Sequence, residues 1–447
     1  MRASFNDIFS GNKNPIHFTN APGRMDVMGG IADYSGSRVL QMAIRENTTV
    51  AIARRDDNVV RIKTLSEEVD PSFFEIDYAE LLNNGKVDYA YANKKLADIP
   101  GGEWASYIVG CLLVLEKEKG LKENKGLDCL VDSRVPAGKG VSSSAALETA
   151  MMKALQQAFD ISFSGTELPR LAQKVENLVV GAPCGLMDQL TSYFGAPRHL
   201  LPILCQPDLI SKPIPVPAHL HFVGIDSGVR HAVGGSSYSD VRAAAFMGYS
   251  IIAMRLGVSN EQLMEARLTG NWKSLPFGGF LANIPVGEFE PNFVSLLPEK
   301  LNGGAFLEEF GNTIDSVTHI NPDRYYQVKQ AASHPVYENE RVGSFSEILE
   351  TMQENHFDRF GLDLMGQKMY ASHDSYSDCG LGTEATDDIV NAVRGKQKKG
   401  LFGARITGGG SGGTVCILCE GEEGLQEAKK IHQHYQEKWG IETTFFS

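Results

Sequence analysis

Residues 135–150 read VPAGKGVSSSAALETA, a glycine-rich turn that leads through three serines into helix-forming residues. Gly138 and Gly140 permit positive φ angles and a close approach of the backbone to a ligand. Serines at 142–144 are typical of helix starts. The first N–H groups of a helix lack intrahelical partners and suit phosphate. Lys139 precedes a glycine, so the loop is not a Walker A motif. A capped helix after a tight turn explains the stretch equally well.

The segments on both sides of this turn predict a mixture of strands and helices. Apolar residues recur at helical spacing after residue 142, which predicts a long helix there. The irregular order of the elements favours an α+β fold over a doubly wound sheet. Strands are predicted at 38–54, 58–64, 127–133, 220–228 and 402–407, and helices at 103–119, 165–180, 238–255, 341–355, 359–374 and 384–395, before a final strand–helix–strand.

Two further stretches carry candidate site residues. Residues 406–418, ITGGGSGGTVCIL, place glycines before a strand-like run. A dinucleotide-binding fingerprint would open a helix instead, so this turn predicts a hairpin or a close approach to a ligand. In residues 175–195, Glu176 lies on a predicted helix and Asp188 follows a turn. Such carboxylates serve as a base, as a magnesium ligand or, more often, as a helix cap.

Residues 21–36, APGRMDVMGGIADYSG, combine charged residues with a loop of glycines and small residues. We expect Arg24 and Asp33 to bind a small polar partner. Gly30 and Ile31, which lie between them, offer that partner no polar side chain.

Composition limits the classes of partner. The 447 residues include 42 basic and 55 acidic side chains, for a formal charge of −13. This balance argues against nucleic acid, although a few amides and one arginine can still hold a phosphate. Seven scattered cysteines favour a reduced, cytoplasmic protein. No apolar run approaches the ~20 residues of a membrane span. Cys416 and Cys419 predict a buried strand, since no second pair completes a zinc site.

Taken together, these stretches resemble the three signature motifs of the GHMP kinases, in the family's order. Residues 21–36 resemble the sugar-binding signature of the galactokinase branch, as do WASYIVG at 104–110, CGLMDQ at 184–189 and MYASHDSYSD near 369–378. The resemblance implies a two-domain fold with a ribosomal-protein-type N-terminal domain at 1–220 and a ferredoxin-like C-terminal domain at 221–447. It places the active site in the interdomain cleft, and implies ATP, Mg²⁺ and a sugar as ligands. The protein is expected to be a monomer or a small homo-oligomer.

The resemblance also implies roles for the matching positions. Asp188 and Arg24 would be catalytic, with Asp188 facing the anomeric hydroxyl of the sugar. Ser143 and Glu176 would bind Mg²⁺. The implied ATP-binding residues are Pro136, Gly138, Lys139, Gly140, Ser142, Ser143, Ser144, Trp104, Gly409 and Gly410. The implied sugar-binding residues are Asp33, Tyr34, Gly30, Ile31, Gly185 and Tyr238.

One departure from the galactokinase pattern bears on the substrate. Galactokinases read GEHTDY where this chain reads GGIADY at residues 29–34. In that family the glutamate reaches toward the hydroxymethyl group at C6 of galactose. Its loss predicts a sugar without that arm, and L-arabinopyranose is galactopyranose with the arm removed. Residues 21–41, 173–192 and 224–242 also resemble the kinase portion of plant L-arabinokinases.

Other functions remain open on these residues. The nearest is a galactokinase with a rearranged C6 pocket. A non-catalytic sugar and ATP sensor is a second alternative, although it need not keep Arg24, Glu176 and Asp188. An acid kinase or decarboxylase of the same family is a third, and the Asp33–Tyr34 pair argues against it.

Overall fold

The computed structural model describes residues 1–122, 125–229, 236–355 and 358–447. They form two compact units, each assembled from separate segments of the chain. Because neither unit is one continuous segment, the boundary expected at residue 220 stays a prediction. The first unit contains Met1–Arg24, Ala43–Ala137 and Ser142–Gly195, and the second contains Met25–Met42, Gly138–Val141 and Ala196–Ser447.

A mixed sheet forms the framework of the first unit. The later part of β2 (Arg38–Arg54) pairs antiparallel with β7 (Leu127–Ser133), which pairs parallel with β3 (Val59–Thr64). β3 pairs antiparallel with β4 (Phe73–Asp77), and β1 (Ile16–Met28) pairs with β2. β-branched side chains on these strands are fully buried in one apolar core. The intervening residues Ala51 and Ala53 of β2 pack with Phe5 in a separate small core, so side chains on both faces of the sheet are buried.

Helices of the first unit pack on this core and position the candidate site. The apolar stripe of α3 is buried, as its helical spacing predicts. A Cβ at Gly110 on α3 would meet the Val175 side chain at 2.6 Å, so only glycine allows the π-helical turn η3 to approach α3 this closely. The elements are α1 (Arg2–Ile8), α2 (Tyr89–Ala97), α3 (Gly102–Lys119), α4 (Ser143–Ala158), α5 (Glu167–Lys174), η3 (Val175–Val180) and α6 (Met187–Phe194), with η2 (Tyr78–Leu81), β5 (Leu82–Asn83) and β6 (Lys86–Val87).

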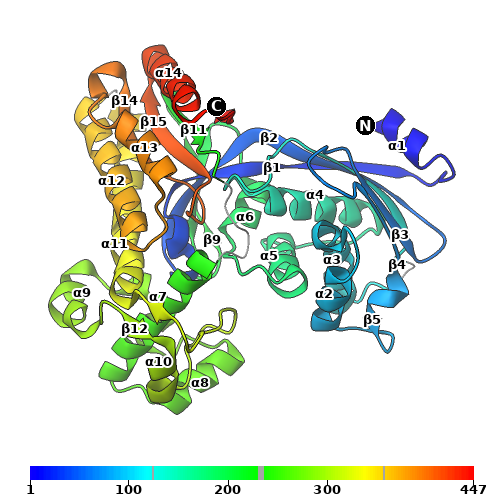
Figure 1. Cartoon of the computed structure of the whole chain (residues 1–447), viewed down its shortest axis with the longest axis horizontal. Coiled ribbons are helices and arrows are strands. Elements are labelled where there is room, and N and C mark those ends of the chain that lie inside the picture. Colours follow the sequence, from blue (N-terminus) through cyan, green and yellow to red (C-terminus); the bar gives the residue numbers. More distant parts are fainter. Residues whose placement is uncertain (123–124, 230–235, 356–357) are drawn as a thin grey trace. The chain divides into compact units, whose positions relative to one another are not determined.

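An antiparallel sheet forms the centre of the second unit. Its strand order is β14–β15–β11–β16, from Leu401–Ile406, Thr414–Glu420, Leu220–Asp226 and Phe445–Phe446. α12 (Arg359–Asp378), α13 (Glu384–Val393) and α14 (Gly421–Trp439) lie beside these strands, and α11 (Val328–Asn355) runs along α12 (Figure 1). The buried residues of the sheet and of α13 and α14 form one apolar core.

The second unit also contains the segment that resembles the sugar signature. The first residues of β2 pair with β8 (His199–Leu204), and η1 (Gly30–Ser35) lies between β1 and β2. Residues of η1 share an apolar core with α7 (Ser236–Arg255). The other elements are β9 (Leu209–Ile210), β10 (Ile214–Pro215), α8 (Asn260–Thr269), η4 (Pro276–Gly279), η5 (Leu281–Asn283), α9 (Val286–Asn292), η6 (Val294–Leu296), β12 (Leu301–Asn302), α10 (Gly303–Phe310), β13 (Tyr325–Tyr326) and η7 (Gln397–Lys399).

Most predicted elements are confirmed, one helix begins earlier than predicted, and the placement of Arg24 is wrong. The strands expected at 38–54 and 127–133 have these bounds, and the helix expected at 103–119 begins one residue earlier, at Gly102. The helix expected at 341 begins at Val328, although it contains Pro335, a residue that usually breaks helices. Arg24 was expected in a loop but lies in β1, because the strand continues through Gly23.

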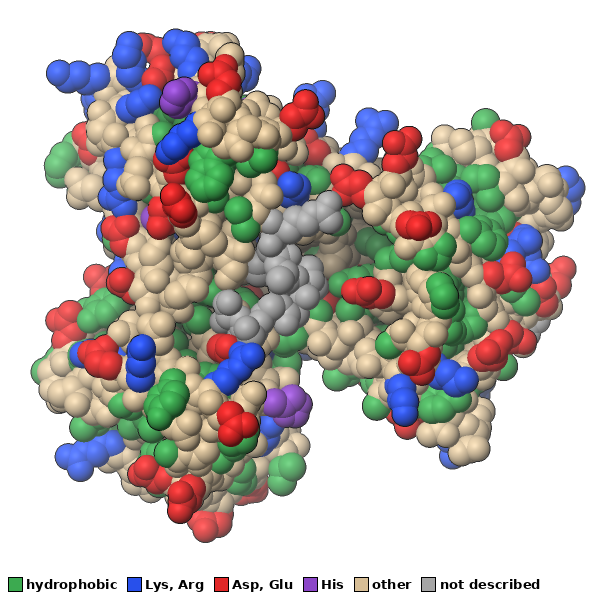
Figure 2. Space-filling model, in the orientation of Figure 1, with side chains coloured by type: hydrophobic (Ala, Val, Ile, Leu, Met, Phe, Trp, Pro, Cys, Tyr) green, Lys and Arg blue, Asp and Glu red, His purple; other side chains and the backbone are tan. Residues whose placement is uncertain are grey.

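The surface carries charges of both signs. Acidic and basic side chains are interspersed over the face drawn in Figure 2. No helix within the described ranges is long and apolar enough to cross a membrane. Cys416 and Cys419 are fully buried in β15, as predicted.

Candidate active site

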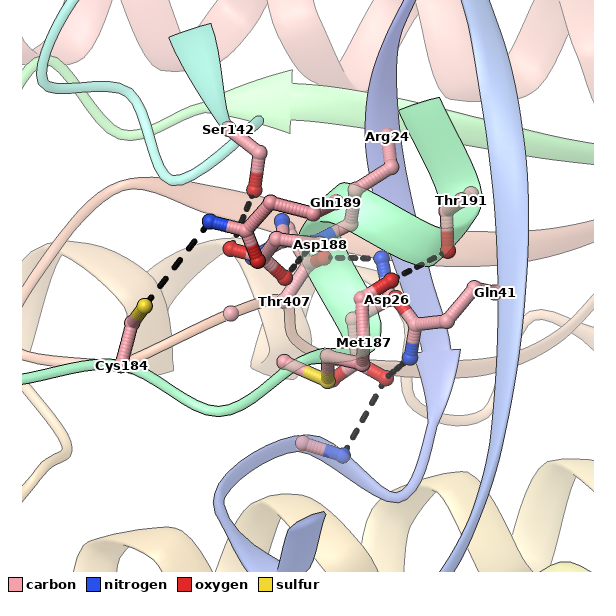
Figure 3. Close-up of polar contacts among 12 residues, drawn as sticks. Arg24, Asp26, Gln41, Ser142, Cys184, Met187, Asp188, Gln189, Thr191 and Thr407 are labelled. Carbon is pink, nitrogen blue, oxygen red and sulfur yellow. Dashed lines mark hydrogen bonds and ion pairs between the residues drawn. The ribbon is translucent and has the colours of Figure 1, made fainter. Parts of the chain in front are cut away.

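The first feature of the site is a two-point ion pair between Arg24 and Asp188. Arg24 Nε lies 2.7 Å from Asp188 Oδ1, and Arg24 Nη2 lies 2.9 Å from Oδ2 (Figure 3). The Arg24 side chain is 4% exposed and that of Asp188 is 20% exposed. Paired donors on a planar guanidinium fix the orientation of a carboxylate. Asp188, in the first turn of α6, is therefore oriented by β1 and remains accessible.

Ser142 contacts the same carboxylate. Its hydroxyl donates to Asp188 Oδ2 at 2.6 Å (Figure 3). Ser142 is the N-cap residue of α4 but has a left-handed backbone, with φ 58° and ψ 54°, and makes no side-chain cap. The expectation of a capping serine is therefore wrong at this position, because the hydroxyl binds a charged acceptor instead. The N–H groups that open α4 are left without a side-chain cap.

Buried carboxyl groups lie behind Asp188. Gln189 Nε2 donates to Glu176 Oε2 at 2.8 Å and to Glu148 Oε2 at 3.2 Å. Burial and then the charge of Asp188 raise the pKa of Glu176 to about 7. Burial and the charge of Glu176 raise the pKa of Glu148 well above its ordinary value. Like charges that share a buried site disfavour ionisation, so this cluster would be stabilised by a cation.

Two further residues from the phosphate-loop prediction lie at the start of α4. Ser144 Oγ donates to Glu176 Oε1 at 3.0 Å. Ser143 is the first residue of α4. Glu176 is thus held by one hydroxyl from α4 and one amide from α6. The assignment of Ser143 as a magnesium ligand stays a prediction.

Residues 138–141 of the predicted phosphate-binding loop belong to the second unit. Gly138 and Gly140 have φ angles of 71° and 72°, in the region that glycine favours. Lys139 Nζ lies 2.8 Å from Asp226 Oδ2, and the Lys139 carbonyl accepts a hydrogen bond from Thr414 Oγ1 at 2.8 Å. The loop therefore lies against the start of β15.

The second glycine-rich stretch is the turn between β14 and β15. A Cβ at Gly140 would lie 3.7 Å from Gly413 Cα, so the two glycine-rich stretches are neighbours. Gly410 has a φ of 75°, which a residue with a side chain rarely adopts. Gly409 lies beside it in the same turn. The hairpin predicted for residues 406–418 is confirmed.

The sugar signature is buried in the second unit. Asp33 is 4% exposed, and its Oδ1 accepts the Tyr34 N–H at 2.7 Å. The Tyr34 ring packs edge-on against Tyr238, with centroids 5.9 Å apart, and burial raises the pKa of Tyr34. Ile31 is 1% exposed, and its N–H donates to Tyr376 Oη at 2.8 Å. The loop thus brings together Asp33, Tyr34 and Tyr238, three of the predicted sugar-binding residues.

Other predicted residues lie at the edge of these clusters. Trp104 packs on the core of the first unit, and its Nε1 donates to the Pro71 carbonyl at 3.0 Å. Tyr107 is near the acidic cluster, since burial and the charges of Glu176 and Glu148 raise its pKa. Pro136 precedes Gly138 in the loop, and Gly185 precedes α6. A role in adenine binding stays a prediction for Trp104. Within the resemblance at 224–242, residues 230–235 lie outside the described residues.

The sequence prediction missed Glu148 and Gln189. Glu148 follows Ser144 by one helical turn and interrupts the apolar stripe of α4. A charged residue on the buried face of a helix signals a polar cluster. Gln189 follows Asp188 directly, and it is fully buried.

A second buried polar cluster lies behind the sugar signature. Arg405 Nη1 lies 2.7 Å from Asp26 Oδ2, and both side chains are 0% exposed. Arg405 Nε donates to Ser372 Oγ at 3.0 Å, and Ser372 Oγ donates to Glu338 Oε1 at 2.6 Å. Asp26 Oδ1 accepts the Gly30 N–H at 3.1 Å. The loop of the signature is therefore fixed by residues from β1, α11, α12 and β14.

Three segments of the chain match models of protein families. The galactose-binding signature of galactokinases matches residues 3–54. The N-terminal domain of GHMP kinases matches residues 106–196, and their C-terminal domain matches residues 343–439.

Curated relatives match nearly the whole chain. L-arabinokinase of Arabidopsis thaliana is 38% identical and covers 95% of this chain. The chain spans 45% of the length of that relative. A galactokinase of Chloroflexus aggregans is 31% identical, over 94% of this chain and 88% of its own length.

Solved structures share the fold. Lactococcus lactis galactokinase complexed with galactose matches with a TM-score of 0.76 and 22% identity, covering 99% of this chain and 95% of its own. A mevalonate kinase structure matches with a TM-score of 0.54 and 14% identity, covering 96% and 97%. The chain therefore belongs to the GHMP kinases and has their two-domain α+β fold. Within that family it is a sugar kinase of the galactokinase and L-arabinokinase type, with ATP as co-substrate.

Proposed function

We propose that this protein transfers the γ-phosphoryl group of ATP to the anomeric hydroxyl of L-arabinose. The observation that carries the choice of sugar is the sequence at positions 30 and 31. Gly30 and Ile31 replace the glutamate and histidine of the galactokinase signature, so no side chain there can bind the hydroxymethyl arm of galactose. A site that is built to bind a hydroxyl group discriminates strongly by that contact, and its loss removes the reason to prefer galactose.

The geometry around Asp188 supports its role in the transfer. Arg24 and Ser142 donate three hydrogen bonds to the carboxylate. These bonds hold it in one orientation. A loose transition state does not require early deprotonation of the sugar hydroxyl. Asp188 therefore orients the hydroxyl and accepts its proton late. Arg24 places positive charge where the transferring group develops negative charge.

The residues near Glu176 fit a magnesium ion. Among the described residues, no three His, Cys, Asp or Glu side chains could hold a metal alone. Magnesium binds one or two protein oxygens together with phosphate and water, so it needs no larger set. Glu148 Oε1 is buried without a hydrogen-bond partner, and burial and the charge of Asp188 raise the pKa of Glu176 to about 7. We assign Glu176 and Ser143 as its ligands. When bound, Mg²⁺ neutralises charge on the phosphate oxygens.

The two glycine-rich stretches support the binding of ATP phosphates. Gly138 and Gly140 have positive φ angles, which allow the backbone to approach a ligand closely. The N–H groups at the start of α4 have no side-chain cap. Such groups bind anions through their partial charges. The Lys139–Asp226 pair anchors the loop at its centre. Asp33, Tyr34 and Tyr238 form the proposed contacts with the hydroxyls of the sugar ring.

Phosphorylation of D-galactose is the second candidate. It is favoured by the galactokinase of Chloroflexus aggregans, which matches this chain over 88% of its own length, whereas the plant L-arabinokinase matches over 45% of its length. In that case a residue outside positions 30 and 31 would bind the hydroxymethyl arm.

The experiment is ADP release from Mg·ATP in the presence of each sugar, with the product examined by ³¹P and ¹H NMR. Coupling between phosphorus and the C1 proton identifies a sugar 1-phosphate. Asp188→Asn serves as the control for a contaminating kinase. Absence of product from every pentose and hexose tested would contradict the proposed function.

A further inference from the structure

Gly30 occupies a position that no other residue type fits. Its φ angle is +36°, which residues with a side chain rarely adopt. A Cβ built on Gly30 would overlap the hydroxyl of Tyr376, and would lie 2.6 Å from Tyr376 Cζ and 2.7 Å from Arg405 Nη2. The space beside position 30 is therefore filled by side chains from α12 and β14.

Tyr376 cannot move out of this space without breaking hydrogen bonds. Its side chain is fully buried. Its hydroxyl accepts the Ile31 N–H at 2.8 Å and donates to the Gly408 carbonyl at 2.8 Å. One oxygen atom thus joins the sugar signature to the glycine turn between β14 and β15. Breaking these bonds would leave a buried donor and a buried acceptor unsatisfied, which is costly.

Arg405 fixes the other side of the ring. Its guanidinium carbon lies 5.1 Å from the centroid of the Tyr376 ring. Asp26 holds the guanidinium by an ion pair of 2.7 Å. Ser372 accepts a hydrogen bond from Arg405 Nε and donates one to Glu338 at 2.6 Å. Arg405 Nη2, which would lie 2.7 Å from a Cβ at position 30, has no hydrogen-bond partner within the described part of the chain.

We propose that Tyr376 is a positioning residue that sets the sugar specificity of this kinase. Its hydroxyl occupies the space that a side chain at position 30 requires, and it holds Ile31 and Gly408 in place. Gly30 and Tyr376 therefore act as one unit. Together they leave this part of the proposed sugar site without a side chain at position 30 that could bind the hydroxymethyl arm at C6. This inference rests on the proposed function and adds a residue from α12 to it.

The first test measures kcat/KM for L-arabinose and D-galactose in Tyr376→Leu. Leucine removes the hydroxyl and empties the space beside Gly30. We expect the ratio of arabinose to galactose kcat/KM to fall about tenfold or more, the range that a change of one or two groups in a pocket produces. Tyr376→Phe keeps the ring, loses both hydrogen bonds and should lower the ratio in the same direction by a smaller factor.

Tyr249 provides the matched control. It is 1% exposed, lies in the same unit and donates its hydroxyl to a backbone carbonyl, that of Pro276, at 2.8 Å. Tyr249→Leu and Tyr249→Phe should reduce stability as much as the Tyr376 variants and leave the ratio within about twofold of wild type. A Tyr376 variant that behaves like its Tyr249 counterpart overturns the inference. If Tyr376→Leu does not fold, Tyr376→Phe decides by the same ratio.

A second measurement tests the steric relationship through stability. Gly30→Ala should lower the melting temperature of the wild type strongly. In the Tyr376→Leu background it should do so less, since the overlap with the tyrosine is gone and only the φ angle and the close contact with Arg405 Nη2 remain. Equal effects in both backgrounds would overturn the steric relationship. A wild-type protein that phosphorylates neither sugar would overturn the proposed function itself. An active wild type with an unchanged ratio in Tyr376→Leu would overturn this inference alone.

Discussion

The Ser142 hydroxyl donates to Asp188 Oδ2, the same oxygen that accepts a hydrogen bond from Arg24 Nη2. One carboxylate oxygen thus carries a neutral donor and a charged donor. Ser142 holds this contact from a left-handed backbone conformation that costs energy in a serine. We interpret the strain as the consequence of aiming the hydroxyl at Asp188 instead of at the end of α4.

Asp188→Asn should reduce turnover by several orders of magnitude, because an amide cannot accept the proton of the sugar hydroxyl. ATP binding should remain nearly unchanged, since asparagine has almost the size of aspartate and its amide oxygen can still accept the hydrogen bond from Ser142. The measurements are kcat by coupled assay and ATP affinity by calorimetry. Asp7→Asn, on the exposed side of α1, is the control. Turnover within tenfold of wild type would contradict the role of Asp188.

Ser142→Ala and Ser142→Gly should each lower kcat by about ten- to hundredfold, the usual effect of one hydrogen bond to a charged group. Glycine adopts the left-handed backbone without strain, so Ser142→Gly should be as stable as wild type or more stable. A loss of activity in both variants, with stability retained in the glycine variant, assigns the effect to the hydroxyl. Full activity in Ser142→Gly would contradict a role of the Ser142 hydroxyl in the reaction.

Arg405→Met should lower the free energy of unfolding by about 3–5 kcal/mol, because it leaves the buried Asp26 carboxylate without its cation. Adding Asp26→Asn should recover part of this loss, since the two side chains interact directly. Urea unfolding of the two single variants and the double variant measures the coupling. The exposed pair of Lys329 and Glu299 is the comparison, and Lys329→Met should change stability little. Additive effects at Arg405 and Asp26 would contradict the coupling.

His334 should make stability depend on pH. Burial lowers its pKa from 6.5 to about 4, and its Nδ1 contacts Ser375 Oγ at 2.7 Å. Below pH 6.5 the unfolded chain binds a proton that the folded protein does not bind until about pH 4. The stability contributed by neutral His334 is therefore complete above pH 6.5 and is lost between pH 6.5 and 4. His334→Gln should show a smaller fall in melting temperature from pH 7.5 to 5 than wild type. An identical fall would contradict the assignment.

The regular elements of the fold could be predicted because their patterns are local. The strand at 127–133 and the helix at 103–119 follow from residues that are neighbours in sequence. The glycine turns were also visible, since Gly140 and Gly410 have the positive φ angles that glycine permits. Pro335 in α11 shows the limit of such rules, because packing against α7 and α12 maintains the helix around it.

The polar clusters could not be predicted from local patterns. Asp26, Glu338, Ser372 and Arg405 are separated by long stretches of sequence and meet only in the folded protein. The contact of Ser142 with Asp188 depends on one φ angle that its residue type does not indicate. The absence of the glutamate at position 30 is visible in the sequence. The structure shows why only glycine fits there, because the Tyr376 side chain fills the space that a Cβ would need.

The most direct test of the central claim is the ratio of kcat/KM for L-arabinose and D-galactose with Mg·ATP in the wild-type protein. We predict a preference for L-arabinose of about a hundredfold or more, equivalent to roughly 2.7 kcal/mol in transition-state binding. A clear preference for D-galactose would contradict the proposed substrate and would mean that another residue binds the hydroxymethyl arm.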